Sequence, residues 1–184
     1  NNLNKNQEVM KTYIKNMKKV WFCFILFAVV AVACKKDEDD PDYVGKWYQT
    51  YTDRGLTFKQ LLTLKKTSFE MLIQIQNLTN PGHYINYMGQ KGTFTVQNDI
   101  LTITLTSIGM AEINPINFMP TGDIVYYDAG SAEFNNLLQQ AGFNDPTFTA
   151  KYAVSGNELT LKIDFNNNGS FDDDADESEV FIRQ

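Results

Sequence analysis

The sequence from residue 43 onward predicts a mainly β domain, an antiparallel sandwich or barrel with one short α-helix inserted near 131–141. Three observations predict this fold class. Short runs of β-branched and aromatic residues alternate with polar ones between turn residues. One hairpin-like pattern occurs twice, and a single stretch has clear helical periodicity. About 140 residues are enough for one domain with its own core.

The chain begins with a segment typical of exported proteins. Two lysines follow Met17, and a 14-residue apolar run extends from Val20 to Ala33, directly before Cys34. A membrane-spanning helix needs about 20 apolar residues, so this run is too short. Basic, apolar and then small residues are the layout of a cleaved secretory signal peptide. We therefore expect residues 1–33 to be a non-mature leader that starts at Met17.

The end of this leader resembles the lipobox of bacterial lipoproteins, on the residues Ala31-Val32-Ala33-Cys34. The charged run 35–40 is similar to the segment that follows the lipidated cysteine in surface-exposed lipoproteins of Bacteroidota. The resemblance implies a covalent lipid, such as palmitate, on Cys34. It also implies anchoring in the outer membrane, on the cell surface or on the periplasmic face, because several acyl chains give stable anchoring. The alternative is an ordinary signal peptide cut after Ala31 or Ala33.

Charge and cysteine content narrow the function of the mature chain. The whole sequence has 16 basic and 22 acidic residues. Five of the lysines and one glutamate precede Cys34, so the mature chain keeps 11 basic and 21 acidic residues, a net charge of −10. Such a surface argues against nucleic acid as a partner. The two cysteines are Cys23 in the leader and Cys34, so a disulfide, a thiolate zinc site and a cysteine nucleophile are excluded from the domain.

Residues 34–42 are expected to be the lipidated cysteine and an acidic tether that ends near Pro41, and residues 43–184 are expected to be the folded domain. Period-two alternation and turn residues such as Asn80-Pro81-Gly82 mark the strands. The expected strands are 44–51, 57–65, 68–76, 84–88, 92–97, 101–106, 151–154, 159–165 and 179–182.

The repeated pattern is an aromatic residue, one spacer and Val, then a polar turn, then Leu-Thr and an aliphatic residue. It occurs at 94–103 and again at 152–161, an offset of 58 positions. The two turns, Asn98-Asp99 and Gly156-Asn157, supply residues that tolerate positive φ. We expect two similar β-hairpins in one sheet.

Between the two copies lie an irregular segment and the helix. Residues 108–127 contain two prolines and two glycines among many apolar residues, and we expect a long loop that covers one end of a barrel or gates a ligand. Residues 131–141 predict the helix, because Ser131 can cap it and Gly142 can end it. The apolar face that should pack on the sheet is Phe134, Leu137, Leu138 and Ala141.

Gly45-Lys46-Trp47 opens the first strand and resembles the Gly-x-Trp that begins lipocalins and lipocalin-like lipoproteins of Bacteroidota. The hairpins and the terminal residues 180–184 are also similar to that family. The resemblance implies an antiparallel lipocalin-like barrel that is closed or partly open. It also implies that Trp47 plugs the closed end and that Arg183 is its cation–π partner. The helix at 131–141 departs from true lipocalins, in which the helix follows the last barrel strand.

The acidic segment 164–177 carries the pattern Asp-x-Asn-x-Asn-Gly, which matches the first half of a calcium-binding loop. Gly169 permits the sharp turn, and Ala175 stands where such a loop has its bidentate glutamate. Strands are expected on both sides, so this would be a calcium loop at a hairpin tip. The expected Ca²⁺ ligands are Asp164, Asn166, Asn168, Ser170 and Asp172. The alternative is a solvated acidic hairpin.

No catalytic residues are predicted, and the protein is not expected to be an enzyme. His83 is the only histidine and lies beside a turn, so no nucleophile-base pair can be assigned. Two functions remain. The first is a lipid-anchored binding or structural protein whose barrel holds a small apolar ligand. The second is a surface module with a packed interior that binds a protein or a glycan, with the aromatic residues as core and rim.

Overall fold

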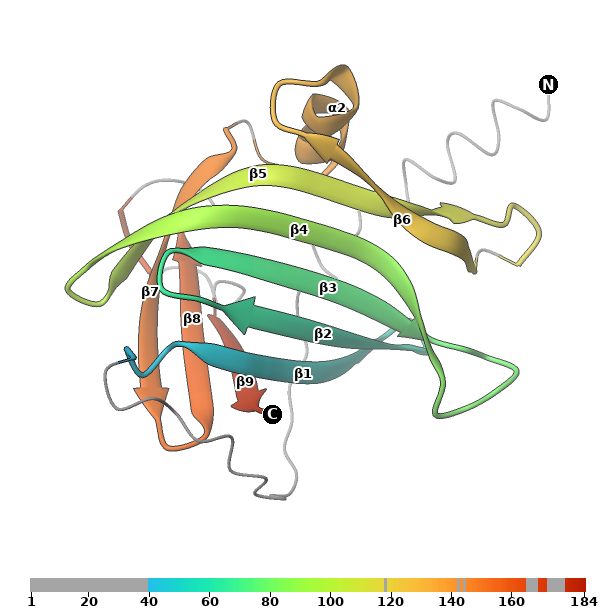
Figure 1. Ribbon diagram of the computed structural model, residues 1–184. Coiled ribbons are helices and arrows are strands. Elements are labelled where there is room, and N and C mark those ends of the chain that lie inside the picture. Colours follow the sequence, from blue (N-terminus) through green and yellow to red (C-terminus); the bar gives the residue numbers. More distant parts are fainter. Residues whose placement is uncertain (1–39, 118, 142, 144, 165–168, 172–177) are drawn as a thin grey trace.

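The computed structural model describes residues 40–117, 119–141, 143, 145–164, 169–171 and 178–184. This part of the chain is mainly β with one short helix (Figure 1), as the sequence predicts. Its strands are β1 (Gly45–Asp53), β2 (Leu56–Leu64), β3 (Ser68–Gln76), β4 (Tyr84–Gln97), β5 (Ile100–Ile113), β6 (Pro120–Asp128), β7 (Thr147–Ser155), β8 (Glu158–Asp164) and β9 (Ser178–Arg183).

Eight of these strands close into an antiparallel barrel in the order β1-β2-β3-β4-β5-β7-β8-β9, and β9 returns to β1. The closing register pairs Arg183 with Trp47 and Ile182 with Tyr48. The remaining strand, β6, pairs with the second half of β5, whereas β7 pairs with the first half. The barrel is therefore closed, which decides between the two forms that the sequence left open.

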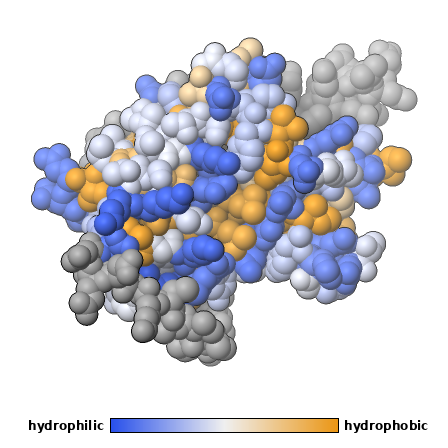
Figure 2. Space-filling model, in the orientation of Figure 1, coloured by the Kyte–Doolittle hydropathy of each residue, from blue (hydrophilic) through white to orange (hydrophobic). Residues whose placement is uncertain are grey.

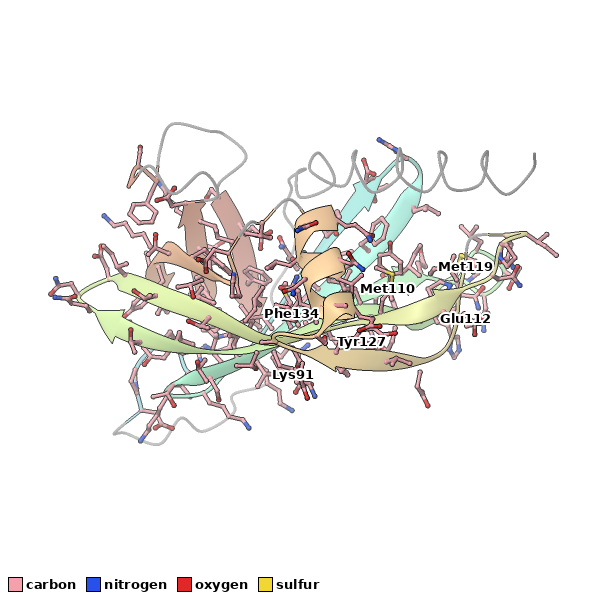
Figure 3. The ribbon with its side chains drawn as sticks, turned by 90° about the horizontal axis from the view of Figure 1, so that it is seen from above. Lys91, Met110, Glu112, Met119, Tyr127 and Phe134 are labelled. Carbon is pink, nitrogen blue, oxygen red and sulfur yellow. The ribbon has the colours of Figure 1, made fainter. Side chains whose placement is uncertain are left out.

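The predicted helix is present as α2 (Ala132–Gln140). The Ser131 hydroxyl caps it by accepting a hydrogen bond from the Phe134 amide at 3.2 Å. Phe134 and Leu138 are buried and Leu137 packs beside them, so the predicted apolar face does contact the core. In Figure 3 the helix lies across β5 and β6, on the concave side of the sheet.

The repeated hairpin is also present, as β4–β5 and β7–β8. Val96 pairs with Leu101 in the first hairpin, and Val154 pairs with Leu159 in the second. Both turns place a residue in the left-handed region, since Asn98 and Gly156 each have φ of 58°. The two copies are neighbours in the barrel because β7 pairs with β5.

The prediction of a long loop over 108–127 was wrong. Strand β5 continues to Ile113 and β6 occupies most of the remaining segment. The predicted strands 84–88 and 92–97 are likewise one strand, β4. Bulges explain both results, because register shifts next to Lys91 and Met110 bend long strands around the barrel without ending them.

Glycines in these strands make room for a side chain and do not break the sheet. Gly89 and Gly109 pair on the outer face of β4 and β5, and Tyr126 of β6 covers them. A Cβ atom at Gly89 would collide with the Tyr126 hydroxyl group. Gly89 and Gly109, which suggest strand breaks in the sequence, therefore form the surface on which Tyr126 packs.

The inward-facing side chains form two separate apolar clusters. The first cluster contains Trp47, lies at the end of the barrel where β1 begins, and continues under α2. The second cluster lies at the opposite end of β2 and β3. Its buried members are Phe58, Ile73, Ile75 and Met88, and partly buried Tyr51, Leu56, Ile85, Tyr87, Met110 and Met119 pack against it.

The outer face of the barrel is not uniformly polar. A row of outward-facing side chains runs in register across neighbouring strands through Tyr48, Leu61 and Leu72, each partly buried. Figure 2 shows hydrophobic residues in the middle of this face and hydrophilic residues around them. Lys59 extends over this row, with its ammonium nitrogen 5.4 Å from the centre of the Tyr48 ring and 5.8 Å from that of Tyr84.

Candidate ligand site in the barrel

The structure brings Trp47 and Arg183 together at the end of the barrel where β1 begins. The guanidinium carbon of Arg183 lies 4.1 Å from the centre of the Trp47 ring, which is fully buried. Arg183 also donates hydrogen bonds to the carbonyl oxygens of Val44, at 3.1 Å, and Asp42, at 2.6 Å. The Trp47 indole donates to the Tyr43 carbonyl oxygen at 2.9 Å. These bonds pair the indole N–H group of Trp47 and both terminal nitrogen atoms of the Arg183 guanidinium group.

A polar layer separates this end from the second cluster. We use the term polar layer for the inward-facing side chains of Gln49, Gln60 and Glu179. Gln49 lies between Trp47 and Tyr51 along β1, so its position divides a residue of the first cluster from one that packs on the second. On β2, Gln60 divides Leu62 from Phe58 in the same way.

Hydrogen bonds join the polar layer across three strands. The Gln49 amide nitrogen donates to the Gln60 side-chain oxygen and to the Glu179 carboxyl oxygen Oε2, the latter at 3.3 Å. Gln60 and Glu179 are 1% and 4% exposed, so these two side chains are shielded from water, and Gln49 is partly buried. Buried side chains of this kind are stable only where their polar atoms find partners.

One atom of the layer has no such partner. Among the described residues, the buried carboxyl oxygen Oε1 of Glu179 accepts and donates no hydrogen bond. Burial raises the pKa of Glu179 to about 8, and the hydrogen bond from Gln49 opposes this shift. Glu179 is therefore mostly neutral near pH 7. Burial also raises the pKa of Tyr51, as does the charge that Glu179 carries at higher pH, so this phenol stays neutral.

The second cluster lies beyond the polar layer and is less completely covered than the first. Six of its side chains are only partly buried, and two of them, Met110 and Met119, come from β5 and the segment before β6. Figure 3 shows these two methionines close together on the side of β5 and β6 that also carries α2, whereas Lys91 lies on the other side. Val125, which pairs with Met110, is 56% exposed. This end of the barrel therefore carries partly exposed apolar side chains, on the far side of the polar layer from Trp47.

The predicted calcium ligands can be located only in part. Asn166, Asn168 and Asp172 lie outside the described residues. Asp164 ends β8 and is buried, and its carboxylate accepts a hydrogen bond from the Gly169 amide at 2.8 Å. Within the described part of the chain, no cluster of three histidine, cysteine or acidic side chains is arranged to hold a metal ion.

The predicted lipidation site, Cys34, lies outside the described residues, as does the rest of the predicted leader and most of the tether. Among the helices of the described segments, none has the length and apolar character needed to cross a membrane.

Gln49, Gln60 and Glu179 were not predicted as a group from the sequence. Alternation from Trp47 and Phe181, which both face inward, would have placed Gln49 and Glu179 inside the barrel. Residue 179 was expected only as the first residue of the strand 179–182, next to the acidic segment 164–177, and no role was given to its side chain. Only the closure of β9 onto β1 brings the three side chains together.

No protein-family model matches the chain. No curated protein matches it. Among solved structures, the chain is similar to an uncharacterized protein from Bacteroides eggerthii DSM 20697, at 19% identity and a TM-score of 0.37, over 78% of this chain and 100% of that one.

Proposed function

We propose that the protein is a lipocalin-like lipoprotein of the bacterial cell envelope, anchored through lipidated Cys34, whose barrel binds a small and mainly apolar ligand. The ligand would lie against the second cluster. The proposal gives the protein a binding role without a catalytic step, and places it on the surface of the outer membrane or on its periplasmic face.

One observation carries the binding proposal. The interior apolar side chains of this closed barrel are divided by a polar layer, and those on the far side of it from Trp47 are incompletely covered. A structural barrel gains most from one continuous core, because each apolar side chain is worth about 1.5–3 kcal/mol only when fully buried. Small-molecule sites instead combine an apolar lining with a few polar groups, which is the arrangement at this end.

The test is binding of the neutral apolar dye Nile red to the purified full chain, followed by fluorescence. We expect saturable binding that Met110→Glu weakens about tenfold or more, because a charge at the apolar surface must be desolvated when the dye binds. Val96→Glu is the matched control, since Val96 is 37% exposed near the β4–β5 turn, at the other end of the barrel, and should leave binding unchanged. Absence of dye binding, or equal losses in both variants, would reject the site.

Anchoring has its own test and its own matched control. The sequence contains two cysteines, and only Cys34 follows the lipobox-like residues. Cys34→Ala should abolish labelling of the protein by radioactive palmitate and release it from the membrane fraction. Cys23→Ala should leave both unchanged. Equal labelling of the two variants would contradict the lipoprotein assignment.

The outer row of Tyr48, Leu61 and Leu72 favours a second candidate, a surface module that binds a protein or a glycan. A sheet face with partly exposed apolar side chains can contact a partner through rings and aliphatic groups. Leu61→Asp would then abolish capture of the partner and leave Nile red binding intact. If the native protein binds Nile red but captures no partner, the barrel interior is favoured as the site.

A further inference from the structure

We infer that the barrel takes a ligand with an amino group at one end of an apolar body, and that Glu179 binds this amino group. The inference rests on the proposed binding function and adds the chemical class of the ligand. It makes Glu179 the specificity-determining residue of the site.

One carboxyl oxygen of Glu179 is buried and unsatisfied within the part of the chain that the structure describes. Glu179 projects into the barrel between the two apolar clusters, and its Oε2 atom is held by Gln49 at 3.3 Å. This bond fixes the carboxyl group, while Oε1 stays buried without a partner among the described residues. Leaving a buried polar atom unpaired is unfavourable, so a donor that reaches Oε1 gains a bond without displacing an existing one.

The buried polar side chains also favour a cationic group on the ligand over an anionic one. None of the buried polar or charged side chains in the described part of the chain is basic: they are Gln60, Gln90, Ser107, Asp164 and Glu179. A ligand carboxylate or phosphate would find no countercharge there. An alkylammonium group would find the carboxyl group of Glu179, and hydrogen bonds between charged groups are the strong ones.

The apolar body of the ligand would occupy the second cluster. Access to Glu179 requires side chains of that cluster to move, and Met88, Met110 and Met119 supply flexible, unbranched side chains that can repack. The ligand's apolar part therefore replaces contacts that these side chains make with one another, and its amino end reaches the polar layer.

Binding of the ammonium group should release the proton of Glu179, and this release can be measured. In the free protein near neutral pH, the buried carboxyl group holds its proton. The arriving ammonium group stabilises the carboxylate, so the carboxyl O–H bond breaks and one proton passes to the solvent for each ligand bound. Tyr51, the neighbouring phenol on β1, stays protonated in both states.

The experiment is titration calorimetry of the full chain with octylamine, octanol and octanoate near neutral pH, in two buffers of different ionisation enthalpy. We expect octylamine to bind about tenfold more tightly than octanol, and octanoate to bind most weakly. Octylamine alone should release close to one proton. Glu179→Gln should remove the preference for octylamine over octanol and the proton release.

The matched control is Glu112→Gln, because Glu112 is an exposed glutamate at the end of β5, two residues from Met110. This variant should keep the preference, which excludes a general attraction of cations to an acidic protein. If Nile red binds but the native protein does not prefer octylamine over octanol, the amine inference is wrong and the proposed function stands. If neither Nile red nor octanol binds, the proposed function itself is wrong. Loss of the preference in Glu112→Gln would also overturn the role of Glu179.

Discussion

The buried carboxyl group of Glu179 makes the stability of the barrel depend on pH in an unusual direction. The folded state raises the pKa of Glu179 from 4.5 to about 8. The native protein therefore holds a proton that the unfolded chain loses between these two values. The contribution of Glu179 to stability is fully present below about pH 4.5 and is lost as the pH rises through about 8. Most acidic side chains that are paired in proteins have the opposite effect.

The size of the effect follows from the two pKa values. They differ by about 3.5 units, and each unit corresponds to about 1.4 kcal/mol, so the full loss of free energy of unfolding is about 5 kcal/mol. Domains of this kind are stable by only about 5–15 kcal/mol in total. The loss should therefore be visible as a large shift of the denaturation midpoint.

The assay is urea denaturation of the native protein and of Glu179→Gln between about pH 5 and about pH 8, followed by tryptophan fluorescence. The sequence has two tryptophans, Trp21 in the predicted leader and buried Trp47, so the change on unfolding reports mainly on the barrel. Glutamine keeps the acceptor for Gln49 and cannot ionise. We expect the variant to match the native protein near pH 5 and to be more stable near pH 8.

Glu158→Gln is the control, because Glu158 is an exposed glutamate on the neighbouring strand β8. Glu158→Gln should keep the pH dependence of the native protein. Comparison with this variant separates the effect of Glu179 from the general effect of removing one negative charge. A difference between native protein and Glu179→Gln that stays constant over this pH range would refute the reasoning, since the carboxyl group would then have the same protonation in both states.

Three further predictions concern other parts of the barrel. Arg183→Ala should lower the free energy of unfolding by about 1–3 kcal/mol, because it removes two hydrogen bonds and the contact with Trp47, and Arg183→Lys should lower it less. An Arg183→Ala variant as stable as the native protein would show that Trp47 alone closes this end. Gly89→Ala should lower the free energy of unfolding measured in urea by about 1–3 kcal/mol, because its Cβ atom collides with Tyr126. In a chain that already carries Tyr126→Ala, the same substitution should cost much less, and equal costs in the two chains would contradict this packing. Calcium should raise the melting temperature measured by calorimetry at low ionic strength, and Asp164→Ala should abolish the rise; equal melting in calcium and EDTA would remove the metal site.

The elements that the sequence predicts well are those with a local cause. The helix α2 follows from Ser131 and the spacing of its apolar residues, and the two hairpins follow from alternation around turns with positive φ. The lengths of β4, β5 and β6 could not be predicted, because glycines and prolines there suggest breaks. Their actual role, such as the packing of Tyr126 on Gly89, depends on the neighbouring strands.

The candidate site could be predicted even less. Gln49 and Glu179 are 130 positions apart and meet because β9 closes onto β1. Alternation from Phe181 points Glu179 inward, but Glu179 also stands at the end of an acidic segment, and its contact with Gln49 has no local cause. The burial of Glu179 depends on the closed barrel, and its neighbours follow only from the pairing of β9 with β1.

The central claim is that the barrel carries a small ligand against the second cluster, beyond the polar layer. Native mass spectrometry of the protein released from its own cell envelope tests this most directly. The account predicts a non-covalent adduct on the lipidated chain, lost in Met110→Glu and kept in Val96→Glu. A chain that carries only its covalent lipid, in the native protein as in both variants, would contradict it.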